Sequence, residues 1–393
     1  GIADPILANE AVVPGLEHVR FWADEIPADP IAEVKRRMPH MPPLGRYAAK
    51  VDGRPVFETL ALSGGGSDGA FGAGLLAGWT ERGDRPEFEV VTGVSAGAII
   101  APFAYLGPAY DETLRRIWTE YSVNQIVVAQ FLPGLFGGDA LTDTSPLKKL
   151  IAQYVDMPML KRIAHEYQRG RILMILTTNL DAQRPVVWNM GEIARAGTPE
   201  ALTLFRQVIL ASAAIPGAFP PVNIPVVAGG KSYEEMHVDG GTTREIFVLP
   251  VDVPFSAFDK LFPRPPLRKL YLIRNGKLTA EQKVVQQQTL PIAGRSITTL
   301  IKSQNWTELY RIYRMAEDDG ADYNLAAVSP NFTLTTDEVY DPKYQTALYE
   351  EGQAFGRAGH WLKAPPSQSP IPYLERSKAP RKQSRASPVA SAN

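Results

Sequence analysis

The chain of 393 residues contains no cysteine, which excludes disulfide bonds, thiolate metal sites and cysteine nucleophiles together. It also lacks any run of the roughly 18–20 apolar residues that a membrane-spanning helix needs. Lys and Arg (41) nearly balance Asp and Glu (42), so a basic face typical of nucleic-acid-binding proteins is not expected. What the chain does have is 45% hydrophobic residues, enough to bury a large core.

The distribution of proline and of regular patterns divides the chain into four segments. Residues 1–56 are repeatedly interrupted by proline and predict an irregular arm, with one helix near 30–37, that packs on the domain. Residues 57–330 alternate strand-like and helix-like stretches, which predicts a three-layer α/β/α domain with a mostly parallel sheet. Residues 331–364 form a helical extension, and the basic, Pro- and Ser-rich segment 365–393 is expected to be disordered.

Within this order, strands are expected over 56–62, 88–92, 171–179, 185–190, 269–274 and 323–328, with another ending at 237–239. Helices are expected over 70–81, 111–121, 146–155, 159–169, 199–213, 296–318 and 342–362, and from the serine turn described below to residue 106.

The chain begins with Gly1 rather than methionine, which is compatible with processing. Together with the proline-rich arm and the lack of cysteine, this favours a secreted or cell-envelope-associated bacterial protein over a cytoplasmic one. The basic tail is compatible with peripheral membrane contact, although a solvated tail is the simpler interpretation. Oligomeric state is left open.

The most informative stretch is G-V-S-A-G at residues 93–97, which lies between a β-rich run and a run of small apolar residues. This G-x-S-x-G order predicts a strand that turns sharply into a helix, with Ser95 at the apex. Glycine is needed at Gly93 and Gly97 because a side chain there would collide with the neighbouring strand or helix. Such a turn exposes the serine hydroxyl and points the first N–H groups of the helix at an adjacent anion.

A second glycine-rich loop, G-G-G-S-D-G at residues 64–69, follows a strand and precedes a helix. It satisfies G-x-G-x-x-G, and Glu87 and Glu89 lie about 20 residues further on, so a dinucleotide site is one interpretation. The other is an oxyanion hole, because consecutive glycines leave their N–H groups uncovered. The serine turn that follows favours the oxyanion hole, since an acyl hydrolase requires both features side by side.

A serine nucleophile needs a base, and the chain has only five histidines. His237 comes closest to a suitable context. Two residues later, Asp239 ends an apolar strand and precedes Gly240 and Gly241. Its carboxylate could accept the Ser95 proton directly if partial burial raises its pKa.

Taken together, the glycine loop, the serine turn and the D-G-G motif at 239–241 resemble the patatin-like phospholipase family. The stretches TTNLDAQRPVV (177–187) and ASAAIPGAFPP (211–221) also resemble family segments that line the site. The resemblance covers roughly residues 57–275. It implies the patatin-like fold and a lipid acyl hydrolase without a metal or organic cofactor, in which Ser95 attacks the ester and Asp239 accepts its proton.

The resemblance also implies supporting roles. The expected oxyanion-hole residues are Gly64, Gly65, Gly66, Ser67 and Ala96, and the expected supports of the turn and dyad are Gly93, Gly97, Gly240 and Gly241. One position departs from the family: many members carry Arg or Lys where this chain has Asp68. An acid near an oxyanion would oppose it unless its side chain points away.

The substrate class that the resemblance implies is a phospholipid, lysophospholipid or galactolipid. Four alternatives stay open: an esterase or thioesterase acting on soluble esters, a Ser-His-Asp hydrolase using His237 or His360, a non-catalytic lipid-binding protein, and a dinucleotide-dependent oxidoreductase. The spacing of Asp139, Asp143 and Asp181 is not that of metal ligands. An apolar lip for an acyl chain is one interpretation of Phe131, Leu132, Leu135 and Phe136, and core packing is the other.

Overall fold

The computed structural model describes residues 1–121, 128–129, 142–143, 145–216, 219–249, 253–281, 285, 287, 289–336 and 340–366. The expected acyl lip at residues 131–136, Asp139 and most of the basic tail lie outside these residues.

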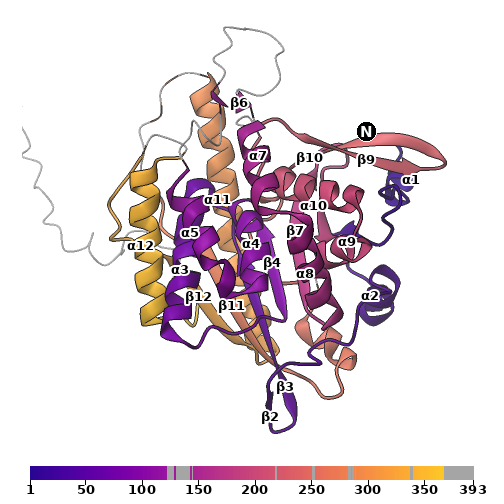
Figure 1. Cartoon of the computed structure of the whole chain (residues 1–393), viewed down its shortest axis with the longest axis horizontal. Helices are drawn as coiled ribbons and strands as arrows, with labels where there is room; N and C mark the ends of the chain where they lie inside the picture. Colours follow the sequence, from indigo (N-terminus) through magenta and orange to yellow (C-terminus); the bar gives the residue numbers. More distant parts are fainter. Residues whose placement is uncertain are drawn as a thin grey trace, which may run out of the picture.

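A central sheet runs through the molecule with helices on both faces (Figure 1). Its strands are β1 (Arg20–Trp22), β2 (Lys50–Val51), β3 (Arg54–Leu62), β4 (Val90–Val94), β7 (Ile172–Asn179), β8 (Arg184–Asn189), β9 (Val222–Ala228), β10 (Lys231–Asp239), β11 (Leu267–Lys277) and β12 (Asp322–Val328).

Five strands at the centre are parallel, in the order β7-β4-β3-β11-β12. Strands β8 and β1 continue the sheet beyond β7 with antiparallel pairing, and the β9–β10 hairpin also pairs antiparallel with the end of β7. A two-stranded ladder of β5 (Val128–Ala129) and β6 (Thr142–Asp143) is separate. The predicted mostly parallel sheet is therefore confirmed.

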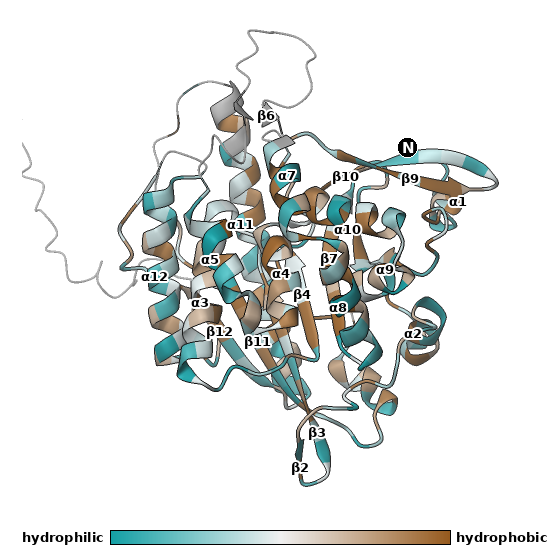
Figure 2. Cartoon of the chain, in the orientation of Figure 1, coloured by the Kyte–Doolittle hydropathy of each residue, from teal (hydrophilic) through white to brown (hydrophobic). Residues whose placement is uncertain are grey.

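The central strands are apolar on both sides, which is the pattern of a sheet covered by helices. All eight residues of β7 are buried, and Figure 2 shows the central strands as apolar with polar residues on the outer helix surfaces. One core lies between the sheet and the helices α3, α4, α8, α10 and α12, and another lies between the opposite face and α11. The three-layer α/β/α prediction is confirmed. The helices are α1 (Pro5–Asn9), α2 (Pro30–Arg37), α3 (Gly69–Arg82), α4 (Ala96–Leu106), α5 (Asp111–Thr119), α7 (Ser145–Tyr154), α8 (Met157–Gln168), α9 (Met190–Ala196), α10 (Pro199–Ser212), α11 (Thr289–Asp318) and α12 (Pro342–Ala358).

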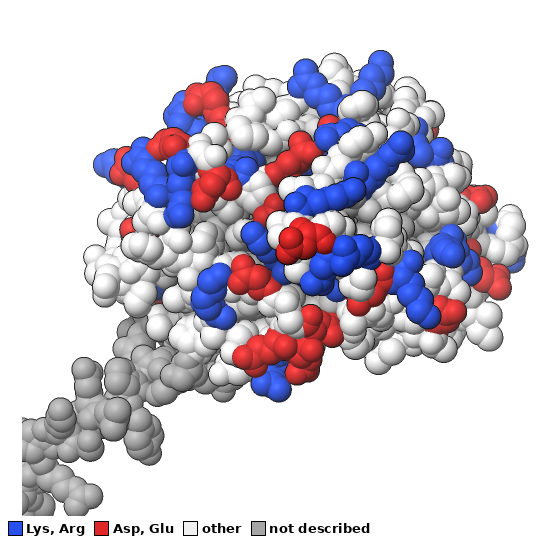
Figure 3. Space-filling view, turned by 90° about the horizontal axis from the view of Figure 1, so that it is seen from below, with Lys and Arg blue, Asp and Glu red and all other residues white. Residues whose placement is uncertain are grey.

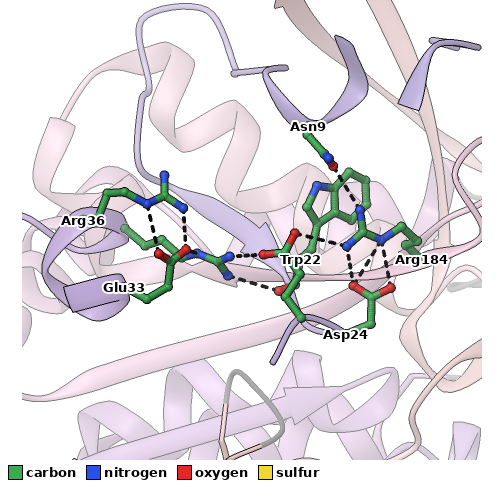
Figure 4. A network of polar contacts seen from close by, with 8 residues as sticks. Asn9, Trp22, Asp24, Glu33, Arg36 and Arg184 are labelled. Atoms are coloured by element: carbon green, nitrogen blue, oxygen red, sulfur yellow. Dashed lines mark hydrogen bonds and ion pairs between the residues drawn. The ribbon is translucent and has the colours of Figure 1, made fainter. Parts of the chain in front are cut away.

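The N-terminal arm contributes to the sheet through β1, which pairs with β8. Arg184 on β8 stacks 4.3 Å from the Trp22 ring centroid and forms an ion pair with Asp24 at 2.6 Å, within the network drawn in Figure 4. Arg20 on β1 forms a buried, bidentate pair with Glu235 on β10. These contacts tie the arm to two strands that lie far along the sequence.

Helix α12 packs directly on α3, backbone against backbone. A Cβ at Gly74 or Gly78 of α3 would overlap backbone carbonyl oxygens of α12, and a Cβ at Gly352 or Gly356 would overlap those of α3. Glycines four residues apart on both helices therefore permit the close approach. The sequence predicted α12 to extend to residue 362, but the helix ends at Ala358 because Gly359 adopts a left-handed conformation (φ 65°).

Strand β9 was not expected from the sequence, and α11 begins seven residues before its predicted start. In the part of the chain that the structure describes, no helix is long and apolar enough to cross a membrane. The face seen from below, at the edge of the sheet where β3 begins, carries acidic and basic side chains in an interspersed pattern (Figure 3).

Candidate active site

The serine turn lies where β4 ends and α4 begins, at the carboxyl edge of the central strands. Ser95 has φ 55° and ψ −121°, a conformation that is strained for a residue with a side chain. A Cβ at Gly93 would overlap the carbonyl oxygen of Gly97, and a Cβ at Gly97 would overlap that of Leu62 on β3. The backbone of the turn therefore lies so close to the start of α4 and to β3 that only glycine fits at positions 93 and 97.

Ser95 and Asp239 are 144 residues apart in the sequence and meet at this edge. The Ser95 Oγ donates to Asp239 Oδ2 at 2.5 Å, and both side chains are buried. The second carboxylate oxygen, Oδ1, accepts a hydrogen bond from the Gly241 N–H at 2.7 Å. Gly240 is packed against β7, where a Cβ would overlap the carbonyl oxygen of Leu176.

The environment of Asp239 favours its protonated form. Burial raises the pKa of Asp239 to about 8, and the charge of Glu245 adds to this rise, whereas the hydrogen bonds from Ser95 and Gly241 oppose it. A Cβ built on Gly241 would overlap Glu245 Oε2 and lie 3.0 Å from Asp239 Oδ1, so the two carboxylates flank this glycine. Arg274 offsets the charge of Glu245 through an ion pair at 3.1 Å.

Ser212, at the end of α10, positions the serine turn and was missed from the sequence. Its hydroxyl accepts the Ser95 backbone N–H at 2.9 Å and donates to the Leu176 carbonyl at 2.7 Å. The Ser95 N–H is therefore engaged and cannot serve an oxyanion. Ser212 lies in the stretch 211–221 that resembles a family segment, but nothing in that stretch signals its contact with Ser95.

The glycine loop lies beside the turn and forms a short 3₁₀ helix over Gly66–Asp68. The N–H of Gly64, which was expected among the oxyanion-hole residues, donates to the Glu245 carbonyl at 3.1 Å. Among the described residues, no acceptor is found for the N–H groups of Gly65, Gly66, Ser67 and Ala96. These four donors stay available to a ligand at the carboxyl edge of the sheet.

Residues at the end of β11 hold the glycine loop in place. The backbone N–H of Asn275 donates to the Ser63 hydroxyl, and its side-chain amide N–H donates to the Ser63 carbonyl, both at 2.8 Å. The side-chain oxygen of Asn275 accepts the Gly72 N–H of α3 at 3.0 Å. Arg274 lies 3.4 Å from the Gly64 carbonyl oxygen. Neither residue was expected from the sequence.

Asp68 points away from the turn and toward α12. Its Oδ1 accepts a hydrogen bond from the Tyr344 hydroxyl at 2.8 Å. Burial raises the pKa of Asp68 to about 6, against the lowering effect of this hydrogen bond. The acid that departs from the family pattern is therefore engaged with a neighbouring helix.

The two candidate histidines have other surroundings. His237 is fully buried, and its two ring nitrogens lie 2.9 Å from Thr177 Oγ1 and 3.1 Å from Glu235 Oε2. Burial lowers the pKa of His237. His360 lines a cavity with Trp79 and Trp361, beyond the end of α12.

The remaining acids show no ligand site. Glu89 accepts the Glu58 N–H at 2.6 Å in the part of the sheet where β3 and β4 begin, so it does not face the glycine loop. Asp181 accepts the Met236 N–H at 2.9 Å. Within the residues that the structure covers, no group of three or more His, Asp or Glu is arranged to bind a metal ion.

An apolar cavity lies beside α4 and is closed by residues of α5, α7 and α10 and by Tyr340. Trp118 on its wall packs against Gly69 at the end of the glycine loop, where a Cβ would overlap the indole. Tyr340 also lies on this wall, where burial raises the pKa of its hydroxyl and the charge of the nearby Asp239 carboxylate adds to the rise. The other lining residues include Ile99, Phe103, Ile117, Leu147, Ile151 and Ile209.

The layered α/β fold and the strained serine turn are the features expected of a serine hydrolase with a nucleophile elbow. Residues 60–252 match the family model of patatin-like phospholipases. The chain therefore contains a patatin-like phospholipase domain, which indicates that it is a hydrolase.

The crystal structure of VipD from Legionella pneumophila is similar to this one with a TM-score of 0.41 and 12% sequence identity, over 80% of this chain and 70% of that chain. No curated protein sequence matches the chain.

Proposed function

We propose that the chain hydrolyses lipid esters through an acyl-enzyme on Ser95, with Asp239 as the general base. The observation that carries this proposal is the 2.5 Å hydrogen bond between the Ser95 hydroxyl and the Asp239 carboxylate at a strained turn. Both ring nitrogens of His237 are occupied by other groups, which supports aspartate over histidine as the base.

In the first step, Asp239 Oδ2 takes the Ser95 proton as Oγ bonds to the ester carbonyl carbon, and the carbonyl electrons move to the oxygen. The N–H groups of Gly65, Gly66 and Ala96 are the candidates to stabilise this oxyanion, each contributing about 3 kcal/mol. The intermediate then collapses, and Asp239 returns the proton to the leaving alkoxide. Asp239 then takes a proton from water as the water oxygen bonds to the acyl carbon. The bond from this carbon to Ser95 Oγ breaks, Asp239 returns the proton to Oγ, and the fatty acid is released.

The apolar residues beside α4 favour an acyl group as the part of the substrate that lies nearest to them. Their side chains are almost entirely hydrocarbon and aromatic, and Trp118 and Tyr340 connect this wall to the glycine loop and to Asp239. The cavity that they enclose has a volume of about 20 Å³, so a fatty acyl chain would have to displace some of these side chains to bind there.

The test is covalent labelling with a fluorophosphonate, followed by hydrolysis assays on long-chain phospholipids and short soluble esters. We expect Ser95 to be labelled, Ser95→Ala to abolish labelling, and Asp239→Asn to slow it by about 10³-fold or more. His237→Gln and His360→Gln serve as controls for a histidine base. Absence of labelling in the folded protein would instead support a lipid-binding role, and turnover of short esters alone would support a soluble esterase.

A further inference from the structure

A second apolar cavity, with a volume of about 80 Å³, lies on the face of the central sheet opposite α4. Three parts of the chain that are distant in sequence enclose it. They are the N-terminal arm from α2 to Leu44, the first halves of β3, β4, β7 and β11, and the segment around the 3₁₀ helix Phe255–Leu261. This cavity shares no lining residue with the one beside α4.

A row of side chains that crosses four paired strands lines one side of the cavity. Leu270 on β11 pairs with Thr59 on β3, and Thr59 in turn pairs with Val90 on β4. Val90 then pairs with Ile172 on β7. Paired residues point to the same face of a sheet, so these four side chains meet the cavity together. Thr59 is the polar member of an otherwise aliphatic row.

The hydroxyl of Thr59 is a buried polar group at this wall. Thr59 is 5% exposed, and its hydroxyl has no hydrogen-bond partner among the residues that the structure describes. On the same face, two residues beyond Val90, the Thr92 hydroxyl donates to the Phe247 carbonyl at 2.5 Å. Because a buried hydroxyl without a partner is unfavourable, a ligand with a hydrogen-bonding oxygen at Thr59 would stabilise this side of the cavity.

Arg268 is the one charged side chain among the described lining residues, and its charge is already compensated. The guanidinium lies 2.6 Å from Asp259 Oδ1 and donates to the Phe255 carbonyl at 2.9 Å. A carboxylate or phosphate that entered the cavity would therefore meet Asp259 as well as Arg268, and its charge would be buried among apolar groups. The wall thus favours a neutral ligand.

The volume limits the ligand to a short hydrocarbon chain. A water-sized group needs about 10–15 Å³, so a cavity of about 80 Å³ holds about six methylene groups. Met38, Met41 and Met174 line it, and methionine side chains adapt readily to the shape of an apolar ligand. Among the described lining residues, Thr59 and Arg268 alone carry polar side chains, which is too few for a cluster of several water molecules.

We propose that this cavity binds a neutral medium-chain alcohol, with its hydroxyl at Thr59 and its hydrocarbon chain against the three lining methionines. The site does not depend on hydrolysis at Ser95, which lies five positions after Val90, or about 16 Å along an extended strand. Since the arm forms one wall, the bound alcohol also strengthens the contact between the arm and the sheet.

Calorimetric titration of the full chain with a series of primary alcohols tests the size and chemistry of the site. Affinity should rise about fourfold per methylene from butanol to hexanol and should rise no further beyond octanol. Hexanoate at pH 8 should bind about tenfold more weakly than hexanol or worse, because its charge would be buried. Thr59→Val removes the hydroxyl, keeps the shape, and should weaken hexanol binding about fivefold. Equal affinities of hexanol and hexanoate, or an affinity that keeps rising to decanol, would overturn the proposal.

Methyl signals of the methionines locate the bound alcohol. In protein labelled with ¹³C at its eight methionine methyl groups, hexanol should shift the signals of the three lining methionines and leave the others unchanged. Val34→Phe places a ring in the cavity and should abolish these shifts, whereas Val51→Phe, at an exposed position of β2, should keep them. Shifts confined to the other methionines, or equal hexanol binding in both variants, would refute the site.

Two controls keep this test decisive. If Val34→Phe does not fold, the identity of the methionine signals that hexanol shifts in the wild-type protein decides between the cavity and another place. Ser95→Ala protein should give the same shifts and affinities as the wild type. The outcome is therefore independent of whether the chain hydrolyses esters, and loss of hexanol binding in Ser95→Ala would assign the alcohol to the serine turn and overturn the proposal.

Discussion

Asp239 is buried between a serine hydroxyl, a backbone N–H and the carboxylate of Glu245. A base of ordinary pKa would be ionised at neutral pH but would have little affinity for a serine proton. Burial and the charge of Glu245 bring the pKa of Asp239 to about 8, which suits a group that must both take and return a proton near neutrality.

The first prediction concerns the pH dependence of activity. Because Asp239 must be ionised to accept the Ser95 proton, kcat/KM for ester hydrolysis should rise with pH and level off above about 8. The rate of fluorophosphonate labelling should follow the same curve, since it uses the same base. Curves that level off near pH 6.5, and shift in His237→Gln, would contradict the role of Asp239.

A second prediction concerns stability. The pKa of Asp239 is about 8 in the folded state and near its ordinary value of 3.8 in the unfolded state. Between these values the folded protein holds the extra proton, so this group makes stability fall as pH rises from about 4 to 8. Asp239→Asn removes that loss. The free energy of unfolding of this variant, minus that of the wild type, should therefore be larger at pH 9 than at pH 5.

Urea unfolding at both pH values measures this difference. Asp84→Asn, at an exposed aspartate, serves as the control and should follow the wild-type change with pH. The same dependence in Asp239→Asn and in the wild type would show that Asp239 is not protonated in the folded protein.

Local sequence predicted the serine and the aspartate because each is marked by adjacent glycines. The residues that support them carry no such mark. Ser212 contacts Ser95 across 117 residues, and Asn275 contacts Ser63 across 212, so no local spacing reports either contact. The engagement of the Gly64 N–H likewise depends on a distant partner, the carbonyl of Glu245.

At the scale of elements, the glycines of α3 and α12 determine how closely these helices approach. The sequence predicted both helices from their periodicity, but their mutual contact is formed across more than 250 residues. The left-handed Gly359 ends α12 earlier than its hydrophobic pattern indicated, since the apolar residues Trp361 and Leu362 lie beyond it. The positions of these two helices could thus be predicted from local sequence, whereas the fact that they pack against each other could not.

Gly352→Leu should separate α12 from α3. The new side chain would overlap backbone atoms of Phe71 and Leu75, neither of which can move without displacing α3. We expect a loss of about 3 kcal/mol or more in the free energy of unfolding, at the upper end of overpacking effects. Ala354→Leu, on the exposed face of the same helix, is the control and should change stability by less than about 0.5 kcal/mol. Equal effects would show that the helices do not pack as described.

The Arg20–Glu235 pair should stabilise the attachment of the N-terminal arm. Burial disfavours the charge of Glu235, but the hydrogen bonds from Arg20 and His237 outweigh it and lower the pKa of Glu235 to about 2. Arg20→Met leaves a buried carboxylate without its partner and should cost about 3–5 kcal/mol in urea unfolding. Arg36→Met breaks an exposed pair with Glu33 and should cost at most about 1 kcal/mol. Similar losses in both variants would argue against a buried pair.

At the scale of the whole molecule, the family match and the folding unit differ in extent. The match spans residues 60–252, whereas β11 lies beside β3 in the middle of the sheet and comes later in the chain. β12 follows β11, and α12 covers α3 from the outside. Sequence alone indicated the strand at 269–274 but not its neighbours, because strand order depends on crossovers and not on local pattern.

A fragment of residues 60–252 should therefore fail to fold as a soluble monomer. The fragment lacks β11 and β12 and keeps only residues 60–62 of β3, so β4 would lie at an edge with unpaired backbone groups, and α3 would expose the glycine-lined face that α12 covers. A fragment of residues 1–366 keeps every described element and should match the full chain in soluble yield, circular dichroism and urea midpoint. If the 60–252 fragment were soluble, unfolded cooperatively and reacted with fluorophosphonate at Ser95, the later strands would be accessory to the fold. Failure of both fragments would instead make the segment after residue 366 necessary for folding.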